Sequence, residues 1–429
     1  MSIYYGGIDM LLEFTVKNFL SIKDEVTLSM VASKDSSHEN NIMPYEGGKK
    51  SALKSVAIYG ANASGKSNIL RALSFVNYFV NTSHEMQQGR SISRIPFKLD
   101  RACLNKPSEF NIIFIQDGIK YAYGFSATEK EVIEEYLYYY PNGRQSTIFE
   151  REDVDKYRFT IDKERQTEIK NKFHSKNKLF LCTESLWEYE KAIPPFKWLS
   201  QSLKVMIEHG NLEAYTVEQL AGDEKIKSII MEYIRKADFA IYDVNANIYD
   251  NINNIPIFKG APDKIKEHIS SILKDKKLFN IKTTHKGLDE KHQPINIEFD
   301  MDEESAGTRK FFGLLGPWID VLLNGYVLAI DELDIRLHPL LTKTLIEIFQ
   351  NPEVNKKKAQ LIFTTHNTNL LNQELFRRDQ IWFTEKHDDG STDLYSLNDF
   401  SVRKDENIEK GYLKGKYGAI PFMSGEWEW

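Results

Sequence analysis

Residues 55–68 combine an apolar segment, a glycine-bracketed loop and the start of a helical pattern. The segment Ser55-Val56-Ala57-Ile58-Tyr59 predicts a buried strand, and the apolar residues recurring from Asn68 to about Asn81 predict an amphipathic helix. Between them, Gly60-Ala61-Asn62-Ala63-Ser64-Gly65-Lys66-Ser67 has the spacing of a phosphate-binding loop. Small residues let successive backbone N–H groups converge on an anion at a helix N-terminus, where the helix dipole also favours negative charge. The segment therefore predicts a strand–loop–helix unit that binds nucleotide phosphates.

Individual positions of this loop have specific expected roles. Lys66 is expected to neutralise the β- and γ-phosphates of ATP, and the Ser67 hydroxyl is expected to ligate Mg²⁺. The expected nucleotide contacts come from Gly60, Asn62, Ala63, Ser64, Gly65, Lys66, Ser67 and Asn68. The alternative is a surface turn that happens to precede a helix, and the motifs farther along the chain argue against it.

An apolar strand in the second half of the chain ends in two carboxylates. Val327-Leu328-Ala329-Ile330 is followed directly by Asp331 and Glu332. Because α/β sheets bind ligands at the carboxyl ends of their strands, both side chains are expected beside the phosphate loop. Asp331 is expected to hold Mg²⁺, directly or through water, and Glu332 to orient and activate the water that attacks the γ-phosphate. The alternative is a strand that ends in an ordinary polar turn.

Two more features complete the expected site. His366 follows the apolar residues 361–365, and its imidazole there can hydrogen-bond the γ-phosphate or the attacking water. Ser305 and the Gly307 amide begin a predicted helix and can bind phosphate at its N-terminus. The alternatives are a histidine satisfied by its own surroundings and a helix N-cap with no ligand.

Composition limits the number of domains, the cellular compartment and the binding partners that can be expected for this chain. The chain has 429 residues, 41% of them hydrophobic, which is enough for two or three domains with ordinary cores. Cys103 and Cys182 provide neither a disulfide framework nor a zinc cluster, and no secretory signal is visible, which favours the cytoplasm. No segment approaches the roughly 18–20 apolar residues that span a bilayer. The net charge of −6 does not imply nucleic-acid binding, which would need basic residues gathered on one face.

The order of strands and helices predicts a mixed α/β architecture. Alternating residues at 11–19 and 25–30 predict antiparallel strands ahead of the phosphate loop. Short apolar strands at 325–330 and 360–364, with a helix between them, predict a parallel sheet covered on both faces. From about residue 151 the chain becomes rich in Lys and Glu with helical periodicity. The predicted division is residues 1–145 as the N-lobe of an ATPase head, 146–240 as an inserted helical lobe, and 241–429 as the C-lobe.

The order of the motifs resembles that of the ABC-type ATPase superfamily. The loop is followed by Ser-x-Gly at a helix start, by the strand ending in Asp331-Glu332 with Leu333-Asp334 directly after it, and by His366. The resemblance implies an ABC-ATPase-like head, with a mixed sheet, flanking helices, an antiparallel β N-lobe and an inserted helical lobe. It also implies a head-to-tail dimer with ATP between the protomers. In such a dimer Ser305 and Gly307 contact the γ-phosphate of the other protomer and Asp334 lies at the dimer seam.

A narrower resemblance includes both ends of the chain and is weakest at 145–240. It is carried by Asn18-Phe19-Leu20-Ser21-Ile22, by residues 60–68 and 304–309, by Asp331-Glu332-Leu333-Asp334 with Leu337-His338-Pro339, by Thr365-His366-Asn367, and by residues 411–421. These segments look like the RloA/AbiL-type, AAA-annotated ATPases of bacterial defence operons. The resemblance implies an abortive-infection role, in which the ATPase responds to a phage trigger and controls a separate TOPRIM-type nuclease.

Two other functional classes fit the same residues. An SMC-like or DNA-repair ATPase would act on DNA, with DNA-stimulated turnover and steep salt dependence of binding. A nucleotide-gated scaffold would bind ATP as a structural ligand with little turnover. In each case the expected ligands are ATP and Mg²⁺, and the expected assembly is a dimer at least, or a larger ring.

Overall fold

The computed structural model describes residues 9–207, 212–237, 239–249, 262, 264–266, 278–403 and 406–421. The chain divides into two compact units. Unit 1 takes its described residues from Met1–Ile207, Leu322–Asp334 and Thr342–Trp429, and unit 2 takes them from Glu208–Val321 and Ile335–Leu341.

One sheet of unit 1 carries the strands on which the expected site depends. Its spatial order is β11 (Leu203–Met206), β15 (Val327–Ile330), β16 (Gln360–Thr364), β5 (Ser55–Gly60), β17 (Ile381–Lys386) and β18 (Thr392–Ser396). The first five strands are parallel, whereas β18 pairs antiparallel with β17. Every residue of β5, β15 and β16 is buried, as expected for parallel strands covered on both faces. The carboxyl ends of these three strands therefore meet at one edge of the sheet.

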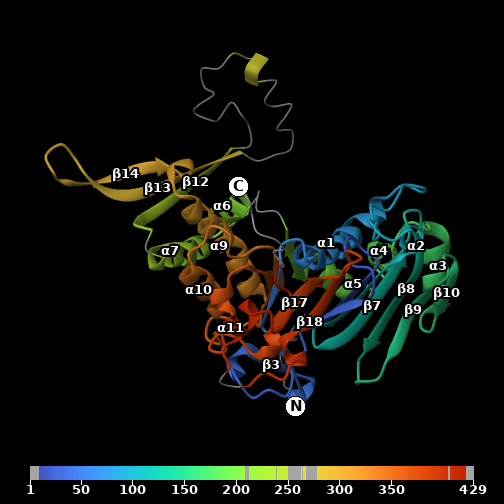
Figure 1. Cartoon of the computed structure of the whole chain (residues 1–429). Helices are drawn as coiled ribbons and strands as arrows, with labels where there is room; N and C mark the ends of the chain where they lie inside the picture. The colour runs from blue at the N-terminus through green and yellow to red at the C-terminus, as the bar shows by residue number, and fades with distance from the viewer. Residues whose placement is uncertain are drawn as a thin grey trace. The chain divides into compact units, whose positions relative to one another are not determined.

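A second sheet of unit 1 is wholly antiparallel. Its order is β10 (Lys156–Phe159), β9 (Ser146–Glu152), β8 (Val132–Tyr140), β7 (Ile119–Ala127), β6 (Ser108–Gln116), β1 (Met10–Lys17) and β2 (Val26–Ser29). Figure 1 shows β7, β8 and β9 running side by side. Asp117 and Gly118 link β6 to β7 with φ values of 52° and 76°, as a tight hairpin turn requires. The antiparallel strands predicted before the phosphate loop thus form part of a larger sheet.

Helices pack on both sheets of unit 1. Helix α1 (Lys66–Thr82) buries its apolar residues and contacts β5 and β11 of the parallel sheet and β1 of the antiparallel sheet. The remaining elements of this unit are α2 (Arg101–Leu104), α3 (Lys163–Phe173), α4 (Phe180–Leu186), α5 (Ile193–Lys197), α10 (Pro339–Gln350, from residue 342), α11 (Ile408–Leu413) and the hairpin β3 (Ile42–Tyr45) with β4 (Lys50–Leu53). The predicted mixed α/β fold class is confirmed.

The segment predicted as a helical lobe, 146–240, has a different structure at its start. Residues 146–159 form β9 and β10 of the antiparallel sheet, and helices follow only from Lys163. The strands were missed because the helical pattern rich in Lys and Glu, which begins near residue 151, was extended back to residue 146. Strand β9 instead has the β-branched and aromatic residues typical of a strand, with Ile148, Phe149 and Arg151 buried. The boundary between the two units also falls at residue 207, inside the predicted lobe.

The described residues of unit 2 include a small sheet and the helices α6 (Leu212–Gly222), α7 (Glu224–Lys236) and α9 (Ala306–Asn324). The antiparallel sheet has the order β12 (Ile241–Tyr249), β13 (Leu278–Leu288), β14 (Pro294–Asp300), as Figure 1 shows. Helices α6 and α7 contact β12, and α9 begins directly after the sheet. The Thr216 hydroxyl on α6 donates to the Gly313 carbonyl of α9 at 2.8 Å, which holds these two helices close together.

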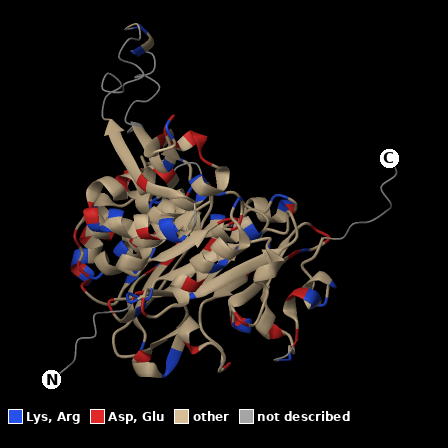
Figure 2. Ribbon diagram, turned by 90° about the vertical axis from the view of Figure 1, so that its left-hand side faces the viewer, with Lys and Arg blue, Asp and Glu red and all other residues tan. Residues whose placement is uncertain are grey.

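Charge and hydropathy of the described residues agree with the composition. Figure 2 shows Lys and Arg intermixed with Asp and Glu along the ribbon. Of the described helices, none combines the length and the apolar character needed to cross a bilayer.

Candidate functional site

The phosphate loop connects the fully buried strand β5 to helix α1. Its backbone turns through left-handed conformations at Ala63 (φ 61°) and Gly65 (φ 106°), and the Ser64 amide donates to the Ala61 carbonyl at 3.2 Å. Gly65 is the N-cap residue of α1 and has no side chain with which to cap the helix. No side chain caps the first N–H groups of α1, so they are available to an anion.

Hydroxyl groups from distant segments brace this loop. The Ser64 hydroxyl lies 2.6 Å from that of Thr384 on β17, and the Thr392 hydroxyl on β18 donates to the Ser64 carbonyl at 2.9 Å. Ser21 contacts the Thr392 hydroxyl at 2.7 Å and accepts a hydrogen bond from the Asn68 amide, also at 2.7 Å. The side chain of Asn68, predicted as a nucleotide contact, thus takes part in the brace. Ser21 lies in a segment that carries the narrower resemblance, but sequence patterns gave no signal that Ser21, Thr384 or Thr392 braces the loop, because each is a single hydroxyl far away in the chain.

Replacing Gly65 by alanine is expected to destabilise unit 1. A Cβ at this position would overlap the Thr392 side chain, and the φ of +106° is one that L residues rarely adopt. We expect the free energy of unfolding to fall by about 2–5 kcal/mol, measured by thermal or urea unfolding. Gly89→Ala is the matched control, since Gly89 also has a positive φ (+82°) but no atom within 4 Å of the added Cβ. Equal losses in the two variants would contradict the packing argument.

Lys66, the first residue of α1, folds back over the loop. Its ammonium group donates to the carbonyls of Gly60 (2.8 Å) and Ala61 (3.0 Å), and the residue is only 6% exposed. Burial lowers the pKa of Lys66 to about 8, although the acidic residues that follow β15 oppose this shift. A phosphate group placed beside this ammonium would favour its charged form, so the position suits an anionic ligand.

The two carboxylates after β15 are held by a threonine of β16. The Thr364 hydroxyl donates to Asp331 Oδ1 at 2.6 Å and accepts a hydrogen bond from the Glu332 amide at 2.7 Å. The Asp331 amide donates to the Met206 carbonyl of β11 at 3.0 Å. Glu332 has a left-handed backbone with φ 49°, which costs a non-glycine residue about 1–3 kcal/mol. Backbone strain of this kind is common where a side chain has to be aimed for function.

His366 lies just beyond the end of β16, at the same edge of the sheet. The side chain is exposed, yet partial desolvation lowers the pKa of His366, and the charge of Lys66 lowers it further. The acidic residues that follow β15 act in the opposite direction. The imidazole is therefore neutral near pH 7 and can accept or donate one hydrogen bond to a ligand. His366 and these carboxylates follow the adjacent strands β16 and β15, and the loop that leads to Lys66 follows β5, the other neighbour of β16.

The site offers Mg²⁺ only part of a ligand set. Asp331 is buried near the loop, Ser67 follows Lys66, and Asp334 Oδ1 is a buried acceptor without a hydrogen-bond partner among the described residues. In the described part of the chain no three His, Cys, Asp or Glu side chains converge as a metal cluster. Mg²⁺ that is bound together with nucleotide phosphates uses only one or two protein carboxylates, so these residues fit a metal that arrives with its nucleotide.

Ser305 and Gly307 belong to unit 2, whereas the other expected site residues belong to unit 1. The Ser305 hydroxyl accepts a hydrogen bond from the Thr308 amide at 3.0 Å and thereby caps α9. A Cβ on Gly307 would lie 2.8 Å from the Arg336 carbonyl oxygen, so only glycine fits there without a shift of the backbone. The Ser-x-Gly segment is thus a rigid helix start, as the sequence predicts.

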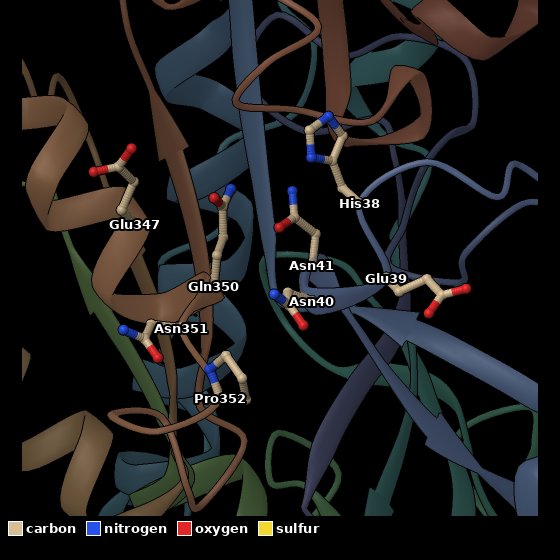
Figure 3. A pocket seen from close by; sticks show the side chains of 8 residues that line it. All are labelled: His38, Glu39, Asn40, Asn41, Glu347, Gln350, Asn351 and Pro352. Carbon is tan, nitrogen blue, oxygen red and sulfur yellow. The ribbon is translucent and has the colours of Figure 1, made fainter.

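A polar cavity of about 770 Å³ lies away from the phosphate loop. Figure 3 shows it between the end of α10, with Glu347, Gln350 and Asn351, and the segment 38–41. The Gln350 amide points to Ser55, the first residue of β5, at 3.4 Å, whereas the phosphate loop follows the last residue of that strand. This cavity is therefore at the opposite edge of the sheet and takes no part in the site described above.

Comparisons with known proteins bear on the family and the fold. The model of the family described as "AAA domain, putative AbiEii toxin, Type IV TA system" matches residues 55–190 and 227–372. Among solved structures, the SMC head bound to the C-terminal winged-helix domain of ScpA matches at 13% identity and a TM-score of 0.41, covering 90% of this chain and 97% of that one. The Smc head of Pyrococcus furiosus matches at 15% identity and a TM-score of 0.39, covering 91% of this chain and 96% of that one. RecF with ATP matches at 12% identity and a TM-score of 0.34, covering 92% of this chain and 100% of that one. Comparison with curated proteins gave no match.

Proposed function

The chain belongs to the AAA-domain family described as putative AbiEii toxin, Type IV TA system, and on this premise we propose that it hydrolyses ATP at a site shared by two protomers. We further propose that it is the sensor and regulatory subunit of a bacterial anti-phage system. The likeness to RloA/AbiL-type ATPases, carried by motifs near both ends of the chain, supports this role.

One observation carries the proposal of hydrolysis. Lys66 on α1, the pair Asp331 and Glu332 after β15, and His366 after β16 share one edge of the parallel sheet, and the two carboxylates act on the pKa of Lys66 and on that of His366. Phosphate binding alone would need the loop and its lysine. An activating carboxylate and a neutral imidazole at the same edge are the additional groups that hydrolysis requires.

The residues divide the chemistry among them. Lys66 and the first amides of α1 bind the phosphates, and Glu332 orients the attacking water. His366, neutral near pH 7, donates a hydrogen bond to the γ-phosphate or to this water. Ser67 and Asp331 would hold Mg²⁺, which supplies charge neutralisation of the phosphates. Ser305 and Gly307 of the second protomer complete the contacts to the γ-phosphate, so turnover depends on association.

Mixing two inactive variants tests whether the site is shared. Lys66→Ala removes the phosphate contact within a protomer, and Ser305→Arg blocks the contact that a protomer offers to its neighbour. Each variant alone is expected to be inactive. In an equimolar mixture half of the dimers carry one intact site, so about a quarter of wild-type ATP hydrolysis is expected to return if the sites act independently. The measurement is phosphate release from purified protein.

The same experiment discriminates the competing interpretations. If each site were completed within one chain, the mixture would stay inactive, because every chain carries a lesion in its own site. Activity of Ser305→Arg alone would likewise contradict a shared site. Turnover that is stimulated by DNA and lost steeply with salt would favour the SMC-like alternative over the defence role.

The proposed partner is a separate TOPRIM-type nuclease that is held or released according to nucleotide state, with a phage protein as trigger. Co-purification of the chain with such a nuclease, compared in ATP and ADP, tests this part of the proposal. Equal recovery of the nuclease with both nucleotides would contradict control by ATP.

A further inference from the structure

The residue directly before the Ser-x-Gly segment is held by the middle strand of the small sheet. Glu304 Oε1 accepts a hydrogen bond from the Thr283 hydroxyl at 2.6 Å and lies 2.6 Å from His285 Nε2. A carboxylate oxygen only accepts, so Nε2 of the imidazole is the donor. The three residues, here called the Glu304 clamp, are well shielded from solvent: Thr283 is fully buried, and the side chains of His285 and Glu304 are 18% and 12% exposed.

The Glu304 clamp lies directly before the residue that caps α9. Ser305 follows Glu304 directly, and its hydroxyl both accepts from the Thr308 amide and lies 2.8 Å from the Thr308 hydroxyl. Gly307 packs close to the Arg336 carbonyl, which leaves no room for a Cβ, as described above. The position of the Glu304 side chain is therefore expected to affect that of the Ser305 hydroxyl and of the first amides of α9, because Glu304 and Ser305 are adjacent in the chain and each is held by hydrogen bonds.

His285 is itself fixed by the edge strand of the sheet. It pairs with Ile297 of β14, and its ring packs against that of Phe299 with centroids 4.9 Å apart and planes at 70°. Thr283 pairs with Phe299 in the same register. Because side chains alternate along a strand, Thr283 and His285 share one face of β13, whereas Thr284 and Lys286 lie on the other. Both clamp donors thus point toward Glu304 from a single strand.

We infer that Thr283 and His285 are positioning residues for ATP hydrolysis, which act through Glu304 to set the place of Ser305 and Gly307 against the nucleotide of the opposite protomer. The inference rests on the proposed function, in which these two residues complete the neighbouring site. It assigns the three-stranded sheet of unit 2 a part in turnover although none of its residues touches the nucleotide. A clamp that held the fold alone would instead stabilise unit 2 without affecting the chemical step.

The test compares two histidine variants in the full-length chain. His285→Leu removes the donor, whereas His285→Gln retains an N–H donor near the position of Nε2. For His285→Leu we expect kcat for ATP to fall about 10- to 100-fold, the range of a lost charge-assisted hydrogen bond or a misplaced reacting group. The KM for ATP should change less than about 3-fold, because the loop of the other protomer binds most of the nucleotide. His285→Gln should recover most of the rate.

Thr283 provides an independent test with a matched control. Thr283→Val keeps the side-chain shape and loses the hydroxyl, so a smaller fall in kcat, about 5- to 20-fold, is expected. Thr284→Val makes the same change on the opposite face of β13 and should leave kcat within about 2-fold of wild type. Unchanged kcat in His285→Leu and Thr283→Val, or equal losses in Thr283→Val and Thr284→Val, would overturn the inference.

Two further outcomes separate this inference from the proposed function. If Ser305→Arg abolishes turnover while His285→Leu leaves it intact, the shared site stands and the positioning role fails. If Ser305→Arg is active, the shared site fails, and the inference fails with it. A thermal unfolding scan accompanies each variant: a rate lost together with the folded state, and not recovered in His285→Gln, also counts against a positioning role.

Discussion

Replacement of Lys66 by alanine is expected to weaken ATP binding at least about 100-fold, which corresponds to about 3 kcal/mol. The ammonium is the one cation that the phosphate loop itself supplies, and it is already held against the carbonyls of Gly60 and Ala61. Calorimetric titration with ATP and Mg²⁺ measures the loss. Lys172→Ala is the matched control, because Lys172 is exposed on α3 and pairs only with Glu168 among the described residues. Undiminished binding by Lys66→Ala would refute the proposed phosphate site.

A second variant at this position, Lys66→Met, should fold at least as well as the wild type. Burial lowers the pKa of Lys66 from 10.5 to about 8, so the unfolded chain binds more protons at this residue between these two pH values. By linkage, the contribution of Lys66 to stability rises as pH increases through that window. Lys66→Met should remove this part of the pH dependence and leave the nucleotide-free protein no less stable at pH 7. Thermal unfolding as a function of pH measures both effects, and a large fall in the melting temperature at pH 7 would contradict them.

Replacement of Glu332 by glutamine should separate binding from hydrolysis. The amide keeps the shape of the side chain, and the hydrogen bond from the Glu332 backbone amide to Thr364 does not depend on the carboxylate. The activating group is lost, so ATP turnover should fall by about 10²- to 10⁴-fold while ATP affinity changes little. A shared site that cannot turn over should retain its nucleotide, and an ATP-bound dimer should accumulate. Phosphate release and light scattering after gel filtration measure these two results.

Glu347→Gln is the control for this substitution. Glu347 lies on α10, where it pairs with Lys343 across one helical turn, beside the cavity at the opposite edge of the sheet. Glu347→Gln should leave ATP turnover and dimer association unchanged. Unchanged turnover and association in Glu332→Gln would show that hydrolysis has no role and would favour the nucleotide-gated scaffold.

The sequence predicted the strands, the loop and the helix at this edge of the sheet well where the signals are local. The β5–loop–α1 unit, the strand ending in Asp331 and Glu332, and the strand before His366 all lie where the patterns indicate. Each depends on a few adjacent residues: an apolar run for a buried strand, or fixed spacing for the phosphate loop. Strands β9 and β10 were missed because their burial comes from neighbours in the antiparallel sheet, and because they lie next to the segment rich in Lys and Glu that begins near residue 151.

Sequence patterns did not identify the residues that hold the site residues in position. Thr364, Thr384 and Thr392 are single hydroxyls in apolar or polar strands, and none belongs to a motif. Their partners are 32 to 371 residues away in the chain. The Glu304 clamp joins residues 19 and 21 positions apart across a strand and a helix start. Such contacts exist only after the sheet has brought its strands into register.

The order of residues alone determined which groups are present at this edge of the parallel sheet: a loop with the spacing of a phosphate-binding loop, a cation within it, two carboxylates and an imidazole, each following a strand. Tertiary structure alone decided how they are held. Thr364 aims the carboxylates, the β17–β18 hairpin braces the loop, and β13 fixes the residue before Ser305. The reason is physical: chain-local steric rules specify strands and turns, whereas hydrogen bonds between remote hydroxyl, imidazole and carboxylate groups depend on the pairing of whole strands.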